Sequence, residues 1–363
     1  MKTKFDARKF LAQHSPLLIL IALLAVVTLV VFFIGSPVIT RLAIGILINV
    51  VLVVGLYIFI GNSGILSFGH IAFVGLGAYF TAWVTMRPMM KKLLLPSLPD
   101  TLQSLAFGPI VALVTVAAAV ALIALISGAA IMRLTGIAAA IGTLAFLAIF
   151  NTLAANANGW TGGVGSLAGV PTNLNLWGVF IWAVIAVVIA HLHARSKAGL
   201  ALRAVREDEA AATACGIRSY RVRLLAYVLS AFVCGIAGNL QARFLGVLSP
   251  DSFYLNATFI ALTMLIIGGM FSLSGAVFGV LIVSVAVELL VRLEGTATVL
   301  GFSLTIPPGT ANLLVALAMC IVLVKRPLGL VGDREWTLRL RRRVNNDGKA
   351  SNSFSEGNPN EAV

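Results

Sequence analysis

Long apolar runs separated by short polar stretches make up most of the chain between residues 16 and 324. A helix needs about 20 mostly apolar residues to cross a bilayer, or fewer where other helices surround it. The pattern therefore predicts an all-α, polytopic membrane helix bundle of about ten spans. The predicted spans are residues 16–34, 42–60, 65–86, 107–132, 137–155, 177–191, 224–246, 257–271, 276–291 and 310–324.

The number of spans is not fixed by this pattern alone. Residues 257–291 can be divided differently around Gly268, Gly269 and Gly275, so nine or eleven spans remain alternatives. The ten-span arrangement has six spans before a hydrophilic segment at residues 193–223 and four after it. Both numbers are even, so the N-terminus, this segment and the C-terminus are predicted to share one side of the membrane.

Composition supports a membrane location. The chain has 363 residues, of which 60% are hydrophobic and 11% charged, and its mean hydropathy is +1.02. Soluble domains have about 25% charged residues. The remaining question is what the net charge of +13 means.

The basic residues gather in short flanks of the apolar region, which is typical of the cytoplasmic side of a membrane protein. We therefore predict that they orient the chain and face membrane lipid, with no nucleic-acid partner. Arg87, Lys91 and Lys92 oppose this topology, because ten spans would place them outside. Apart from the central segment, the flanks comprise Lys2, Lys4, Arg8, Lys9, Lys325, Arg326, Arg334, Arg339 and residues 341–343.

Three regions follow: a cytoplasmic N-terminus at residues 1–15, a transmembrane domain at 16–332 that includes the loop 193–223, and a cytoplasmic tail at 333–363. The first apolar run, residues 16–34, is long for a signal peptide and has no small-residue cleavage site after it. We predict an uncleaved span there. The tail lacks the apolar residues needed to fold and is predicted to be disordered.

The central segment, residues 195–223, carries seven Lys/Arg and three consecutive acids. Charged residues cost roughly 2.5–3.5 kcal/mol each at a bilayer centre, and ten of them on the order of 25 kcal/mol, so this segment must stay in water. A short, charged, helical loop between membrane helices is predicted to dock a cytoplasmic partner that supplies energy. The alternative is a solvated loop helix without a partner.

Helix signals occur within this segment. Gly199 precedes a run of good helix formers, and Gly216 stands where a helix would stop. Arg203 and Glu207 are four residues apart, so they share a helix face and can pair. The candidate coupling residues are Arg203, Arg206, Glu207, Asp208, Glu209 and Gly216.

Two glycine-rich stretches, residues 61–77 and 266–279, interrupt the apolar runs with serine and histidine. Non-helical backbone is tolerated at membrane depth only where protein or a wet cavity surrounds it, so broken or re-entrant segments beside a transport path are one interpretation. The other is that the glycines let helices approach closely, and His70 by itself is typical of a hydrogen-bonded interior histidine. The candidate pathway residues are Ser67, Gly69, His70, Gly75, Gly268, Gly269 and Ser272.

Other chemistry is not indicated by the sequence. It contains no phosphate-binding loop, and its three cysteines have no metal-ligand spacing, so no metal site is predicted. Glu288 and Arg292 lie one helical turn apart and are predicted to form a local ion pair. Because ion-coupled carriers have ionisable residues within their spans, an ion-coupled secondary transporter is a less favoured alternative.

These motifs together resemble the permease subunits of bacterial ABC importers for branched-chain amino acids, specifically the longer of the two paired permeases. The resemblance covers residues 49–332. It rests on GILSFGHIAFVGLGAY, TLAF with TGGVGSLAGVP, the block from SKAGLALRAVREDEAAATACGI to ARFLGVLSPDSF, GGMFSLSGAVFG and KRPLGLVG.

The resemblance implies a multi-pass protein of the bacterial inner membrane with cytoplasmic termini. It also implies a sister permease, two cytoplasmic ATP-binding subunits and an extracytoplasmic substrate-binding protein. ATP would be bound by the partner subunits, and the chain itself would be no enzyme and hold no cofactor. The charged segment would be the coupling helix, which carries the candidate residues named above to the ATPase.

The chain departs from the family pattern in places. Importer permeases carry Glu-Ala-Ala with Gly four residues after the second Ala, whereas here Gly216 follows Ala211 by five. Ile71 stands where a small residue is usual, and the sequence TGGVGSL lacks an expected Asn. The permeases of urea or short-chain amide importers share the fold and are the second-ranked alternative.

Overall fold

The computed structural model describes residues 7–293, 295–299, 302–307, 309–326 and 329–332. The predicted tail, residues 333–363, and residues 1–6 of the predicted N-terminal region lie outside the described residues.

Ten apolar helices account for the ten predicted spans, one helix for each. Eight helical segments of the described chain are long and apolar enough to cross a membrane, and α3 and α15 have 16 residues each. The predicted all-α polytopic bundle is thereby confirmed. The ten helices are α1 (Ala7–Ile34), α2 (Pro37–Ser63), α3 (His70–Thr85), α6 (Pro109–Ile131), α7 (Gly136–Asn156), α9 (Leu176–Arg195), α12 (Ser219–Leu245), α13 (Leu255–Gly268), α14 (Leu273–Leu293) and α15 (Thr310–Lys325).

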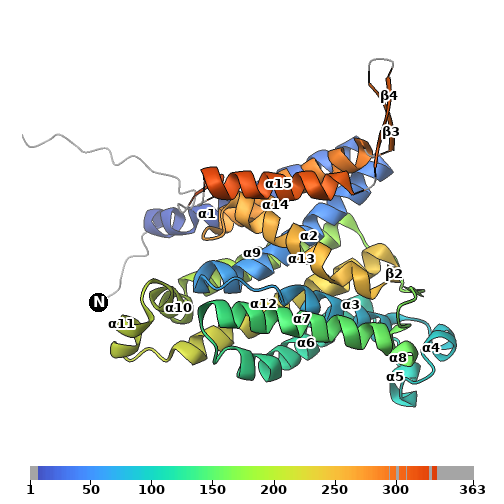
Figure 1. Ribbon diagram of the computed structural model, residues 1–363, viewed down its shortest axis with the longest axis horizontal. Helices are drawn as coiled ribbons and strands as arrows, with labels where there is room; N and C mark the ends of the chain where they lie inside the picture. Colours follow the sequence, from blue (N-terminus) through green and yellow to red (C-terminus); the bar gives the residue numbers. More distant parts are fainter. Residues whose placement is uncertain (1–6, 294, 300–301, 308, 327–328, 333–363) are drawn as a thin grey trace, which may run out of the picture.

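Successive apolar helices run in opposite directions along the long axis of the bundle (Figure 1). Helix α1 begins, and α15 ends, at the end that carries α10 (Lys197–Glu207) and α11 (Glu209–Ala214). We call this the α11 end. The opposite one is the α4 end, because α4 (Pro88–Leu94), α5 (Asp100–Ser104) and α8 (Asn158–Thr161) lie there. The charged central segment, the start of α1 and the end of α15 thus lie at one end of the bundle. This agrees with the even numbers of spans predicted before and after the segment.

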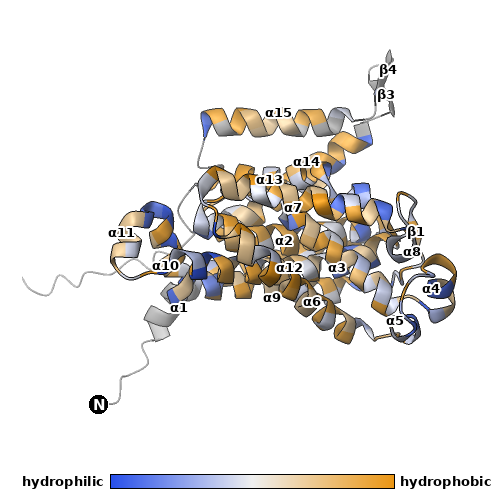
Figure 2. Ribbon diagram, turned by 60° about the horizontal axis from the view of Figure 1, so that its bottom comes forward, coloured by the Kyte–Doolittle hydropathy of each residue, from blue (hydrophilic) through white to orange (hydrophobic). Residues whose placement is uncertain are grey.

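Hydropathy follows this arrangement. Figure 2 shows apolar residues along the length of the bundle and hydrophilic residues concentrated at α10 and α11 and around α4 and α5. Many large apolar side chains of α1, α6 and α7 are exposed, such as Phe33, Ile110 and Ile137. Exposed apolar surface of this kind suits contact with lipid or with another membrane subunit.

Helices α2 and α12 form the centre of the bundle, where glycines bring backbones together. A Cβ atom on Gly77 would lie 2.7 Å from the carbonyl oxygen of Gly235, and one on Gly238 would overlap the carbonyl oxygen of Val74. Helix α3 therefore packs on α12 with almost no side chain between them. Small residues at helix contacts are the usual means of close packing in membranes.

The chain is irregular between α2 and α3. Helix α2 ends at Ser63 and is capped by Gly64, whose φ of 71° is left-handed, and α3 starts only at His70. The amide of Phe68 donates to the Thr143 hydroxyl (3.2 Å), so α7 satisfies part of this backbone. The predicted span 65–86 is therefore a short helix preceded by a non-helical segment in which Ile65, Ser67 and Gly69 are buried and Leu66 is exposed.

Several short elements were not predicted from the sequence. Strands β1 (Leu167–Ala168) and β2 (Val247–Leu248) pair antiparallel, with Leu167 opposite Leu248, and the 3₁₀ turn η1 (Pro250–Phe253) follows. Strands β3 (Gly295–Val299) and β4 (Phe302–Ile306) form a hairpin at the α4 end. These pairs leave the fold class unchanged.

Lys91 holds the short helices at the α4 end together. Its side chain is fully buried, and its ammonium group donates to the carbonyl oxygens of Leu102 (3.1 Å) and Leu105. Burial lowers the pKa of this lysine. Lys91 therefore serves the packing of α4 on α5.

Candidate functional site

Helix α10 lies against the ends of the membrane helices. Ser196 caps it by accepting a hydrogen bond from the amide of Gly199 (3.1 Å), and the same hydroxyl donates to the carbonyl of His193. Leu202 and Val205 are buried beneath it, towards α12, α2 and α9. An amphipathic sequence thus fixes α10 to the bundle rather than leaving it free in solvent.

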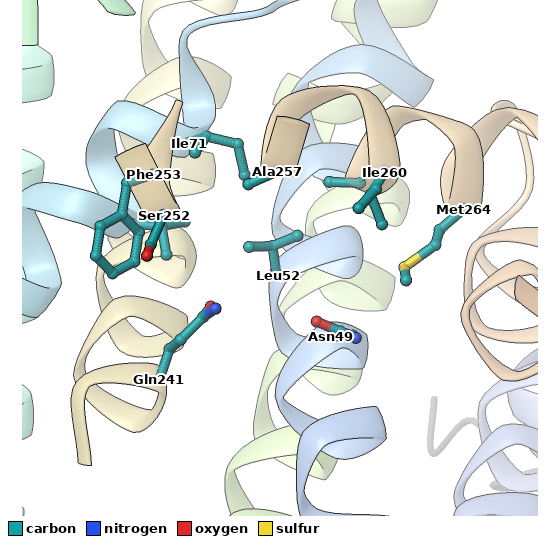
Figure 3. A pocket seen from close by; sticks show the side chains of 11 residues that line it. Asn49, Leu52, Ile71, Gln241, Ser252, Phe253, Ala257, Ile260 and Met264 are labelled. Atoms are coloured by element: carbon teal, nitrogen blue, oxygen red, sulfur yellow. The ribbon is translucent and has the colours of Figure 1, made fainter. Parts of the chain in front are cut away.

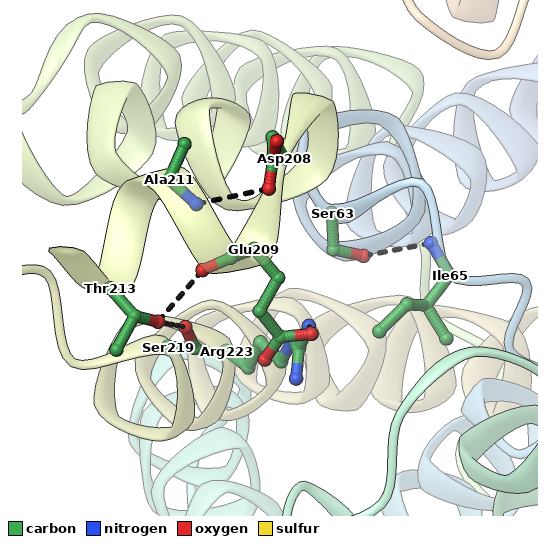
Figure 4. Close-up of polar contacts among 8 residues, drawn as sticks. All are labelled: Ser63, Ile65, Asp208, Glu209, Ala211, Thr213, Ser219 and Arg223. Atoms are coloured by element: carbon green, nitrogen blue, oxygen red, sulfur yellow. Dashed lines mark hydrogen bonds and ion pairs between the residues drawn. The ribbon is translucent and has the colours of Figure 1, made fainter.

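The charged segment forms two helices where the sequence predicted one. Asp208 leaves the helical conformation and caps α11, because its carboxylate accepts a hydrogen bond from the amide of Ala211 (3.0 Å; Figure 4). Glu209 forms an ion pair with Arg223 of α12 (2.7 Å). Gly216 follows α11 with a left-handed φ of 83°, so the predicted helix stop is confirmed.

The predicted pair of Arg203 with Glu207 does not form. Arg203 donates instead to the carbonyl oxygen of Ala194 at the end of α9 (2.6 Å). Glu207 pairs with its neighbour Arg206 (2.6 Å). Ala194 lies in the last turn of α9, where the carbonyl groups have no partner within the helix, and Arg203 satisfies one of them.

Arg206 joins three parts of the chain. Its Nη1 atom donates to the carbonyl oxygen of Gly61 at the end of α2 (3.0 Å), and its guanidinium lies 4.6 Å from the ring centroid of Phe271. Phe271 belongs to the turn between α13 and α14. Among the candidate coupling residues, Arg206 is therefore the one that links α10 directly to the end of α2 and to the α13–α14 turn.

Helix α11 projects beyond the bundle. Only Ala212 is buried, whereas Ala210, Ala211, Ala214 and Cys215 are exposed. Glu207 is also largely exposed, with 72% of its side chain accessible. The candidate coupling residues are thus brought together at one end, next to the exposed alanines of α11.

The first group of candidate pathway residues takes part in helix packing. The Nδ1 atom of His70 is hydrogen-bonded to the Ser67 hydroxyl (2.7 Å), and the imidazole is fully buried. A Cβ atom on Gly69 would lie 2.5 Å from the carbonyl oxygen of Thr143. A Cβ on Gly75 would overlap the ring of Phe150.

The second group lies in the sharp turn between α13 and α14. A Cβ atom on Gly268 would overlap the carbonyl oxygen of Gly275, and the Ser272 hydroxyl accepts from the amide of Gly275 (3.0 Å). Gly269 packs against Gly329 of the KRPLGLVG motif. This turn is at the α11 end beside Arg206.

A cavity open to the surface is lined by residues that the sequence analysis did not name as candidate pathway residues. Asn49 of α2, Gln241 of α12 and Ser252 of the η1 turn contribute its polar groups, and the carboxamides of Asn49 and Gln241 extend into the same space (Figure 3). Apolar side chains complete the wall. They are Leu52, Ile71, Val74, Phe253, Ala257, Ile260, Ala261 and Met264.

The size and chemistry of this cavity suit a small solute. Its volume is about 190 Å³, below the ~300–1,000 Å³ of pockets for drug-sized ligands and several times the ~30 Å³ share of one water. Amide and hydroxyl groups donate and accept hydrogen bonds without a net charge. None of the seven candidate pathway residues lines it.

A signal for the cavity residues was present in the sequence. Asn49 is an isolated amide within an apolar run, and Gln241 lies with Asn239 and Arg243 in the last part of the predicted span 224–246. Polar side chains within spans usually face the interior of a bundle. Whether these side chains line the same cavity depends on how α2 packs on α12, and no local sequence motif predicts this packing. The predicted pair of Glu288 and Arg292 is confirmed, with an N–O distance of 2.8 Å.

Comparison with known proteins decides the family. A profile described as the permease component of the branched-chain amino acid transport system matches residues 38–324. The chain belongs to this family. The match runs from α2 to α15 and includes both the charged segment and the amide-lined cavity.

Known permeases show the same relationship. The high-affinity branched-chain amino acid transport system permease proteins LivM of Salmonella typhimurium and Escherichia coli are each 27% identical to this chain over 281 residues, covering 67% of this chain and 61% of theirs. The chain therefore spans about three fifths of the length of these relatives. LivH of Salmonella typhimurium is 36% identical over 111 residues, covering 31% of this chain and 35% of its own. No solved structure matches the chain significantly.

Proposed function

We propose that this permease is a transmembrane subunit of an ATP-driven importer that moves branched-chain or similar hydrophobic amino acids into the cytoplasm. The observation that carries the proposal is the projecting α10–α11 segment in a chain that matches the branched-chain amino acid permease family. Such a segment offers a surface to which an ATP-binding subunit can bind. The names of the LivM and LivH relatives favour amino acids over urea or short amides as the substrate.

The partners follow from the same argument. The α11 end faces the cytoplasm, where the exposed alanines of α11 and Glu207 contact one of two ATP-binding subunits. The exposed apolar helices face lipid and a sister permease of the kind that LivH represents. A substrate-binding protein docks at the α4 end. ATP binds to the partner subunits.

Transport then proceeds by alternating access. Closure of the ATP-binding subunits pushes α11, and α10 transmits this movement through Arg206 to the end of α2 and to the α13–α14 turn. The amide-lined cavity lies farther along α2, at Asn49 and Leu52. Its uncharged polar groups hold a zwitterion weakly, which allows release, and selection rests mainly with the delivery protein.

Reconstitution into proteoliposomes tests this proposal. The chain alone is expected to show neither uptake nor ATP hydrolysis. With the sister permease, both ATP-binding subunits and the loaded binding protein, uptake of labelled leucine should require ATP. Uptake by the chain alone, driven by a proton gradient, would contradict the proposal and favour an ion-coupled transporter.

A further inference from the structure

A row of hollows follows one face of α2 from its first turn to the amide-lined cavity. The outermost hollow, of about 510 Å³, is lined by Thr40, Arg41 and Arg243 among others. The next, of about 520 Å³, shares Arg41 and Phe244 with it and shares Asn49 with the cavity. Arg41 and Asn49 are eight residues apart and thus lie on the same helix face. Neighbouring hollows thus share lining residues, and the three follow one another along α2 from the α4 end inwards.

Arg243 is the most unusual residue of the outermost hollow. Its side chain is only 8% exposed, and its Nη2 atom donates to the backbone carbonyl (3.1 Å) and the side-chain oxygen (2.9 Å) of Asn173. Within the described residues, no carboxylate pairs with it. A buried charge without a counter-charge is costly, and in a membrane protein it marks a functional site by default.

Arg41 adds a second positive charge to the same hollow. Its guanidinium lies 5.2 Å from the ring centroid of Phe244, the residue after Arg243. The first turn of α2 also lines the hollow, and the N-terminal end of a helix carries partial positive charge. The one acid lining the neighbouring hollow, Glu288, is already paired with Arg292. The outermost hollow is therefore electropositive and suited to an anion.

We propose that Arg41 and Arg243 form a vestibule that binds the α-carboxylate of the substrate before the substrate reaches the amide-lined cavity. This inference rests on the proposed function. A guanidinium binds a carboxylate through charge-assisted hydrogen bonds, often two at once. The deep burial of Arg243 and the continuity with the cavity favour a small solute over an acidic side chain on the surface of a delivery protein.

Neutralisation of each arginine tests the vestibule in the complete reconstituted importer. Arg41→Gln, at an exposed position, and Arg243→Gln are expected to lower the maximal rate of leucine uptake at saturating binding protein about tenfold or more, because each removes a charged hydrogen bond. Basal ATP hydrolysis and the affinity of the loaded binding protein should stay unchanged. Arg243→Lys retains the charge and should recover part of the rate. Arg87→Gln removes an exposed charge at the same end and is the matched control.

Two outcomes overturn the vestibule. Uptake at the wild-type rate in both Gln variants would show that the arginines bind no substrate. A loss that more binding protein restores, together with weaker docking, would assign the arginines to acidic residues of that protein. Absence of ATP-driven uptake in the wild-type complex is a different result, since it would reject the proposed function itself.

Discussion

Gly238→Leu is expected to prevent stable folding of the bundle. The Cβ atom at this position would overlap the carbonyl oxygen of Val74 and lie 3.0 Å from the amide nitrogen of Ala78. Both are backbone atoms of α3, so no rotamer change relieves the overlap, and α3 must move away from α12. Overpacking costs about 1–3 kcal/mol and occasionally more, and a contact with backbone atoms belongs at the upper end of this range. Thermal unfolding of the purified protein in detergent, with the yield of monodisperse protein, measures the effect.

Gly178→Leu is the matched control. Gly178 lies inside α9, and a Cβ atom there would meet nothing within 4 Å. Replacing a helical glycine removes a local cost of roughly 1 kcal/mol, so this variant should be as stable as the wild type or slightly more stable. Equal stability of the two leucine variants would contradict the close packing of α3 on α12.

Arg206→Ala is expected to uncouple ATP hydrolysis from transport. The substitution removes the hydrogen bond to Gly61, the stacking on Phe271 and the ion pair with Glu207, but it leaves the exposed alanines of α11 in place. The ATP-binding subunits should therefore still bind and hydrolyse ATP, while uptake per ATP falls about tenfold, as expected for loss of charged hydrogen bonds. Parallel measurement of leucine uptake and phosphate release in proteoliposomes gives this ratio.

Lys197→Ala provides the comparison for Arg206. Lys197 is an exposed cation at the start of α10, on the same helix. Its removal should leave the ratio of uptake to hydrolysis unchanged. A wild-type ratio in Arg206→Ala would show that movement reaches the membrane helices by another route.

Hydropathy predicted the spans well because each span is a local property of the sequence. The differences at helix ends have simple causes. Helix α12 starts at Ser219, before the predicted residue 224. Its first residues include Arg221 and Arg223 and so lie outside the apolar run on which the prediction was based. Helix α3 starts later than predicted because residues 64–69 are irregular.

The side-chain partners could not be predicted in the same way. Spacing within one helix suggested the pair of Arg203 and Glu207, but Ala194 and Arg206 are closer partners in the folded chain. The pair of Glu288 and Arg292 did form, since it depends on one helix alone. A pair of side chains within one helix can be predicted from their spacing where no other element offers either of them a partner.

The cavity depends on contacts between distant parts of the chain. Asn49 and Gln241 are far apart in sequence and meet only because α2 and α12 pack side by side at the centre. The glycine-rich stretches were one predicted location of the transport path, because glycine, serine and histidine interrupt apolar runs there. Their glycines serve close helix contacts, and the cavity walls are built by ordinary residues.

Crosslinking from Cys215 tests the central claim, that the α10–α11 segment is held by an ATP-binding subunit in the cytoplasm, most directly. Cys215 is exposed beside α11, Cys234 is buried, and Cys320 is exposed on α15 and can be replaced by serine. In the assembled importer, a bifunctional maleimide should join Cys215 to an ATP-binding subunit. A cysteine placed at the exposed Thr101 position of α5, at the α4 end, should give no such product. Labelling of Cys215 by an impermeant maleimide added outside intact cells, or an intact complex without the crosslink, would contradict the account.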